Sequence, residues 1–117
     1  MRDFRKLEIW KRSFGLVVKV YQLTNQLPTK EQFGLTSQVN RAAVSIPSNI
    51  AEGCGRSSNA DLNRFIDMAV GSSFEVETQL MLIKEIYGTA GTLELLSEIN
   101  ELQKMMNSFK TYLKDRG

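Results

Sequence analysis

The chain has 117 residues, with 15 Lys and Arg against 13 Asp and Glu, no His, one Cys and two Pro. A chain of this length is expected to form one domain over residues 1–117 with a single hydrophobic core. Without histidine, Ser-His-Asp and Cys-His catalysis and imidazole metal sites are excluded, and the lone Cys54 cannot form an internal disulfide, so we expect a cytoplasmic, non-enzymatic protein without metal or cofactor.

The first predicted helix covers residues 7–27. Apolar side chains recur three or four residues apart along it, and we expect this face to lie in the core rather than to stack on bases. Its members are Leu7, Trp10, Phe14, Val17, Tyr21 and Thr24. The apolar run at residues 16–18 is too short for a signal or membrane-spanning segment, so no membrane association is expected.

Three basic residues share another face of this predicted helix. Arg5, Arg12 and Lys19 recur every seven residues, and such a stripe can follow the phosphates of a nucleic acid. An ordinary solvated helix face is the alternative, because Asp3 and Glu8 dilute the positive charge.

The second predicted helix begins with a capping box formed by Thr29 and Gln32 and runs to Gly53. Its apolar stripe is assigned to the core and consists of Leu35, Val39, Ala42, Ala43, Ile46 and Ile50. Pro47 cannot donate a hydrogen bond to the preceding turn, so we expect the helix to be kinked there.

This second helix lacks a charged, solvated face. Between Gly34 and Ala51 its only charged residue is Arg41, and small, weakly polar side chains on every side favour contact between copies of the chain. The expected interface comprises Gln38, Arg41, Ser45, Ser48, Asn49 and Glu52, with Glu75 of the third helix, or Glu77, as the mate of Arg41 in a neighbouring subunit. The alternative is that this helix sits in the middle of its own bundle.

Two further long helices follow, one from Ser58 to Tyr87 and one starting near Thr92. The third carries Leu62, Phe65, Ala69, Ser73, Val76, Leu80, Ile83 and Tyr87 at helical spacing, and the fourth carries Leu93, Leu96, Ile99, Leu102, Met106, Phe109 and Leu113. Short connections make neighbouring helices antiparallel. The sequence therefore predicts an all-α, up-down-up-down four-helix bundle.

The segment Gly53-Cys54-Gly55-Arg56 looks like a fragment of a phosphate-cradling loop. A helix stop, a turn and an N-cap also explain these residues. If an anion binds here, Arg56 and Ser58 are its expected ligands, whereas Cys54 has no neighbouring group to activate its thiol.

Basic residues concentrate in the first half of the chain. Residues 1–56 contain nine Lys or Arg and four Asp or Glu, for a formal charge of +5, whereas residues 57–117 contain six and nine, for −3. The first half is therefore the more favourable for contact with phosphates.

Several runs resemble a known family. They are residues 41–53, Gly55-Arg56, Arg64-Phe65 and Gly71-Ser72, followed by Glu75, Glu77, Thr78, Gln79 and Leu80. In these the chain is similar to the bacterial four helix bundle protein family, also called the 23S rRNA intervening-sequence protein family, and to the accessory variability determinant of diversity-generating retroelements. The resemblance implies a four-helix bundle, a homopentameric ring, no established catalytic activity, and RNA or a nucleoprotein as partner.

Two functional hypotheses follow. The first is a non-catalytic oligomeric scaffold that binds RNA or a nucleoprotein through basic surfaces of its ring, with Arg5, Arg12, Lys19, Arg56 and Arg64 as the contacting residues. The second is a protein-protein adaptor with no nucleic-acid contact. No small-molecule substrate is evident, and the two hypotheses differ in salt dependence, because only phosphate contacts weaken steeply as salt rises.

Overall fold

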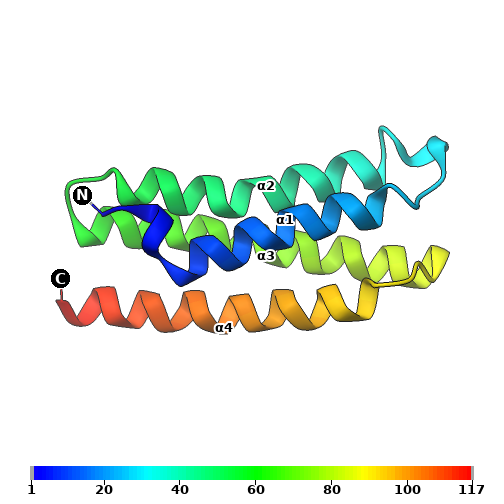
Figure 1. The fold of residues 1–117 in the computed structure, drawn as a ribbon. Helices are drawn as coiled ribbons and strands as arrows, with labels where there is room; N and C mark the ends of the chain where they lie inside the picture. The colour runs from blue at the N-terminus through cyan, green and yellow to red at the C-terminus, as the bar shows by residue number, and fades with distance from the viewer. Residues whose placement is uncertain (1, 117) are drawn as a thin grey trace.

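The computed structural model describes residues 2–116 and is all-α, with no strand within those residues. Its long helices are α1 (Glu8–Thr24), α2 (Leu35–Cys54), α3 (Asn59–Tyr87) and α4 (Thr92–Arg116), and two short 3-10 helices, η1 (Phe4–Lys6) and η2 (Thr29–Glu31), precede α1 and α2. Consecutive long helices run in opposite directions, and both termini lie at the same end of an elongated bundle measuring 46 × 22 × 20 Å (Figure 1). The predicted four-helix, all-α class is confirmed.

Each long helix packs against two neighbours. The α2 helix lies against α1 and α3, and α4 also lies against α1 and α3. The two remaining pairs, α1 with α3 and α2 with α4, are therefore diagonal across the bundle. This arrangement leaves each helix one outward face.

The core forms between all four helices. In α2, the expected stripe is confirmed from Val39 to Ile50, while Leu35 is half-buried. In α3, the expected positions from Leu62 to Ile83 are all buried. Burial of this apolar surface is the main stabilising contribution to the fold, at about 25 cal/mol per Å² removed from water.

The predicted core face of α1 is wrong. Its true core face consists of Ile9, Ser13, Leu16, Val20 and Leu23, about 100° around the helix from the expected stripe. Of the expected residues, Phe14 is 53% and Tyr21 45% exposed, whereas Trp10 is half-buried and only Thr24 is buried. Leu7, Trp10 and Val17 pack against the core from the expected face, so the bundle covers this second apolar face only in part.

The predicted start of the second helix is also wrong. Thr29 lies in η2, and the side chain that satisfies the first turn of α2 is that of Glu31, whose Oε1 accepts a hydrogen bond from the backbone N–H of Leu35 at 3.1 Å. The hydroxyl of Tyr87 at the end of α3 donates to the other carboxylate oxygen of Glu31. This bond lowers the pKa of Glu31, helped by the Leu35 N–H, and raises the pKa of Tyr87.

The predicted α4 stripe is wrong at its start. Leu93 is 63% exposed, and Leu95 occupies the core in its place. From Ile99 onward the expected periodicity holds, with Leu102, Met106 and Leu113 buried. The buried residues Thr92, Leu95 and Ile99 keep the three- and four-residue spacing of the rest of the helix, so the core stripe of α4 has one register throughout and Leu93 lies outside it.

Pro47 is buried inside α2, which continues on both sides of it from Leu35 to Cys54. Nearby serine hydroxyls bond to carbonyls of the same turn, Ser45 to that of Ala42 at 2.7 Å and Ser48 to that of Val44 at 2.8 Å. The kink itself stays a prediction. No helix in residues 2–116 combines the length and apolar character needed to cross a membrane.

Candidate functional site

The basic stripe predicted on the first helix does not form one surface. Arg5 belongs to η1, and the extended backbone of Leu7 separates it from the register of α1. Its guanidinium pairs with Asp3 at 3.2 Å, and Lys19 pairs with Glu98 of α4 at 2.8 Å. Arg12 is exposed and has no acidic partner within residues 2–116.

The structure instead gathers basic residues at one end of the bundle, where both termini and the turn between α2 and α3 lie (Figure 1). The backbone N–H of Arg2 donates to the carbonyl of Cys54 at 3.1 Å, which fixes the N-terminal segment beside the α2–α3 turn. We define the basic end as Arg2, Arg56, Arg64, Lys110, Lys114 and Arg116. These residues come from four segments of the chain. Arg56 and Arg64 are also among the residues that the sequence predicts to contact RNA.

Aromatic rings hold the arginines of the basic end. The guanidinium of Arg56 lies 4.6 Å and that of Arg64 5.0 Å from the ring centroid of Phe65. On the α4 side, Arg116 lies 4.3 Å from the centroid of Tyr112, and Arg2 lies 5.9 Å from the same ring. The Arg116 guanidinium beside Tyr112 lowers the pKa of that phenol. Stacking of this kind orders a guanidinium while leaving its N–H edge free for an anion.

Some of these cations have carboxylate partners. Arg56 pairs with Glu52 and Arg64 with Asp61, each at 3.2 Å, and Lys110 pairs with Asp67. Such exposed pairs are worth about 0 to 1 kcal/mol and break readily in favour of another anion. Within the described chain, no carboxylate forms an ion pair with Arg2, Lys114 or Arg116. The exposed Asp115 lies between the last two in sequence, so the basic end keeps a small excess of positive charge.

A small cavity of about 220 Å³ lies beside Arg2 and Arg56 of the basic end. Arg2, Arg56, Ser57, Ser58 and Asn59 line it at the start of α3. Ser58 is the N-cap of α3, where its Oγ accepts the N–H of Asp61 at 3.1 Å. The anion predicted at Arg56 and Ser58 stays a prediction, although Arg2 joins them here.

The glycine-rich segment before this cavity serves packing. Gly53 and Cys54 form the last turn of α2, and a Cβ on Gly53 would lie 2.7 Å from the Cβ of Phe65 on α3. Only glycine permits this approach of the two helices. Cys54 is buried, and burial raises the pKa of its thiol, which opposes formation of a reactive thiolate.

Part of the predicted oligomer interface is already occupied within the chain. The hydroxyl groups of Ser45 and of Ser72 on α3 are hydrogen-bonded to each other at 2.6 Å, and the Asn49 amide donates to the Ser45 carbonyl at 2.8 Å. Glu52 pairs with Arg56. Gln38, Arg41 and Ser48 are exposed on α2.

The two acidic candidates for Arg41 now differ. Glu77 accepts a hydrogen bond from Gln103 of α4 at 3.0 Å. Glu75 is exposed and, like Arg41, has no ion pair within residues 2–116. The pairing of Arg41 with either residue of a neighbouring subunit stays a prediction.

The sequence-based reasoning missed an apolar groove between α1 and α2. We call it the α1–α2 groove. It has a volume of about 380 Å³ and is lined by Phe4, Trp10, Phe14, Val17, Val18, Val44, Pro47, Ser48 and Ala51. The sequence did contain an indication of this groove, because the apolar residues of α1 cover more than half of the helix circumference.

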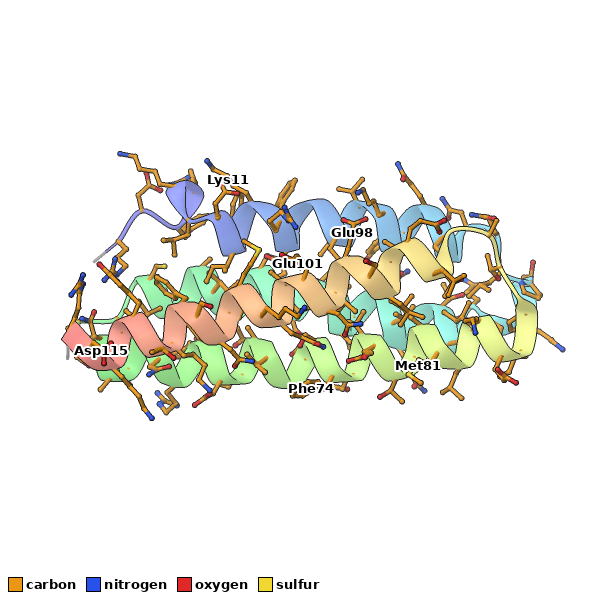
Figure 2. All side chains as sticks on the ribbon, turned by 90° about the horizontal axis from the view of Figure 1, so that it is seen from below. Lys11, Phe74, Met81, Glu98, Glu101 and Asp115 are labelled. Carbon is orange, nitrogen blue, oxygen red and sulfur yellow. The ribbon has the colours of Figure 1, made fainter. Side chains whose placement is uncertain are left out.

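A second apolar surface was also missed. The outward face of α3 exposes five apolar side chains, which we call the α3 ridge, namely Met68, Phe74, Met81, Leu82 and Ile86. Figure 2 shows Phe74 and Met81 at the outer edge of α3, on the side of the bundle away from α1. Scattered exposed apolar residues are ordinary, but five of them on the outward half of one helix make a candidate interaction surface.

Comparisons with known proteins agree with this fold. The family model described as 23S rRNA-intervening sequence protein matches residues 5–108. The chain is also similar to the crystal structure of a protein of unknown function from the S23 ribosomal protein family of Bacteroides thetaiotaomicron, with 22% identity, a TM-score of 0.76, and coverage of 87% of this chain and 97% of that chain. At this identity the likeness shows the fold alone. No curated protein matches the chain.

Proposed function

The chain belongs to the 23S rRNA-intervening sequence protein family, and from that membership we propose that it is a non-catalytic, cytoplasmic scaffold that binds ribosomal RNA or a nucleoprotein containing it. The basic end is the RNA-contacting surface in this proposal. The family description refers to ribosomal RNA and names no reaction.

The observation that carries the proposal is the clustering of cations at one end of the bundle. Arg2, Arg56, Arg64 and Arg116 lie beside aromatic rings there, and Lys110 and Lys114 follow on the last turns of α4. Arginine and lysine contacts to phosphate supply most of the non-specific affinity for nucleic acid. The rings are partly occupied by the arginines, so phosphate contact rather than base stacking is the expected mode.

Assembly of several copies strengthens this role. We include in the proposal a homo-oligomeric ring, for which the resemblance described above implies a pentamer. Rotational symmetry with bundles aligned along the ring axis would place every basic end on the same face. Several weak phosphate contacts then act together, and overall affinity rises by multivalency without any new type of contact.

The proposal is tested by RNA binding of the assembled protein with a fluorescently labelled structured RNA. Removing charge at the basic end with Arg64→Gln or Arg116→Gln is expected to weaken binding and to reduce the slope of log K against log salt by about 0.7 to 0.9 for each phosphate that a copy no longer neutralises. Lys30→Gln is the matched control, because Lys30 is an exposed cation in η2, at the opposite end of the bundle (Figure 1). Equal binding by all variants would refute the assignment of the basic end.

A protein-protein adaptor is the alternative, and the exposed α1–α2 groove favours it. An assembled protein that binds no RNA at either low or physiological salt would exclude the first function. A polypeptide partner that binds with little dependence on salt would then support the adaptor, since apolar contacts are screened little by ions.

A further inference from the structure

Two apolar surfaces lie on different sides of the bundle. The α1–α2 groove is a concave surface with exposed Phe14, Val18 and Val44 at its rim and buried Pro47 at its floor. The α3 ridge covers the convex, outward half of the helix diagonal to α1, with Phe74 and Met81 projecting outward (Figure 2). A two-fold contact that pairs one of these surfaces with itself leaves the other exposed, whereas a contact between the two covers both.

The spacing of the two surfaces is compatible. Phe74 and Met81 are seven residues apart on α3, and Trp10 and Val17, which both line the groove, are seven residues apart on α1. Seven residues span about 10.5 Å along a helix. The projecting side chains of the ridge therefore repeat at the same distance as the residues along the groove wall.

Charge is complementary as well. Arg41 lies one turn before Val44 on α2, beside the groove, and it is exposed without an ion pair among the described residues. On α3, the exposed Glu75 and Glu85 lie among the ridge residues and likewise have no ion pair there. A cation beside the groove and anions on the ridge favour docking of unlike faces and disfavour groove against groove.

We propose that the α3 ridge of one copy docks into the α1–α2 groove of the next copy, with Arg41 facing the neighbour's Glu75. The contact is heterologous, so each copy uses a groove toward one neighbour and a ridge toward the other. Repeated contacts of this kind close into a ring or extend as a filament. The inference specifies the contact for the assembly in the proposed function and does not depend on RNA binding.

The first test compares the oligomeric state of single variants by sedimentation velocity. The two variants are Phe14→Glu in the groove and Met81→Glu on the ridge. Phe14 is 53% exposed and Met81 56% exposed in the isolated chain, so both variants are expected to fold. Each places a charge in the proposed contact and is therefore expected to lose assembly. Leu93→Glu is the control, because Leu93 is similarly exposed on α4 but belongs to neither surface. Circular dichroism verifies that the helices are retained.

A monomeric wild type at micromolar concentration would overturn the proposal. Retention of the full assembly by both the groove variant and the ridge variant, with their helices intact, would also overturn it. Loss of assembly in Leu93→Glu as well would show that the effect is not confined to the two surfaces, and would count against the assignment.

Mixing the two variants separates a heterologous contact from a two-fold one. The Phe14→Glu chain keeps an intact ridge and the Met81→Glu chain keeps an intact groove, so one productive contact forms between them. The mixture is expected to give a 1:1 heterodimer with twice the mass of one chain, which is 13.3 kDa. Each variant alone is expected to be monomeric. A mixture that stays monomeric would overturn the proposed pairing.

Charge exchange tests the register of the contact. Arg41→Glu and Glu75→Arg are each expected to weaken self-association by about fivefold or more, since an opposite-charge pair becomes a like-charge pair. The double variant in one chain restores the pair at every contact and is expected to recover the wild-type affinity. Failure of the double variant to recover would refute the Arg41–Glu75 contact. RNA binding of the assembled wild type is measured separately and decides the proposed function, so failure of the contact and failure of RNA binding are distinguished.

Discussion

Replacement of Gly53 by alanine tests the close approach of α2 and α3. A Cβ at this position would lie 2.7 Å from the Cβ of Phe65 and 2.9 Å from the Cδ1 of Leu62, whereas non-bonded carbons prefer about 3.5 to 4.0 Å. Glycine to alanine within a helix gains about 1 kcal/mol. Overpacking costs about 1 to 3 kcal/mol, and the upper value applies because the Phe65 Cβ is fixed to its backbone and cannot rotate away.

The clash therefore outweighs the helix propensity, and Gly53→Ala is expected to lose about 2 kcal/mol of unfolding free energy. For a chain of this size that corresponds to a fall in Tm of about 6 to 12 °C. Gly15→Ala is the matched control, since a Cβ there meets nothing within 4 Å inside α1. It is expected to gain about 0.5 to 1 kcal/mol.

Urea unfolding followed by circular dichroism gives both values. The chain concentration is held constant, because assembly makes apparent stability depend on concentration. A Gly53→Ala protein as stable as the wild type would refute the packing argument. A change of the unfolding free energy in the same direction for Gly53→Ala and Gly15→Ala would also refute it.

Three further predictions follow. Leu80→Ala, at a fully buried position of α3, is expected to lower the unfolding free energy by about 2 to 5 kcal/mol, and a decrease well under 1 kcal/mol in urea unfolding would contradict the core assignment. The lowered pKa of Glu31 stabilises the fold above its ordinary value of 4.5, and this contribution is lost as pH falls through the lowered pKa. Thermal melts of Glu31→Gln should therefore depend less on pH below 4.5 than those of the wild type, and identical pH profiles would be evidence against the cap. The Cys54 thiol, buried and with a raised pKa, is expected to react with a thiol reagent at pH 8 only after denaturant is added; fast reaction of the folded protein would contradict its burial.

The sequence predicts the helices better than it predicts their inward faces. The periodicity of α3 identifies its core because the helix has one continuous buried stripe from Leu62 to Ile83. In α1, the stripe with Ile9 and Leu16 is buried, while the stripe with Phe14 and Tyr21 is exposed. Periodicity shows that both faces are apolar but cannot rank them, because burial is decided by packing against α2 and α4.

Long-range contacts explain the other differences. Thr29 and Gln32 satisfy the pattern of a capping box, yet Glu31 caps α2 because Tyr87, far along the chain, holds its carboxylate in place. The basic end could be predicted in part. An up-down bundle places the two termini and the α2–α3 turn together, which brings Arg2, Arg56 and Arg116 to one end. The ion pair that engages Lys19 depends on the packing of α1 against α4, which a linear pattern does not contain.

The central claim is that the basic end binds RNA by contact with phosphates. The most direct measurement is the affinity of the assembled protein for a structured RNA across a series of salt concentrations. We expect log K to fall linearly with log salt, with a shallower slope for Arg64→Gln and Arg116→Gln and the wild-type slope for Lys30→Gln. Absence of binding at low salt, or an affinity that does not change with salt, would contradict the claim.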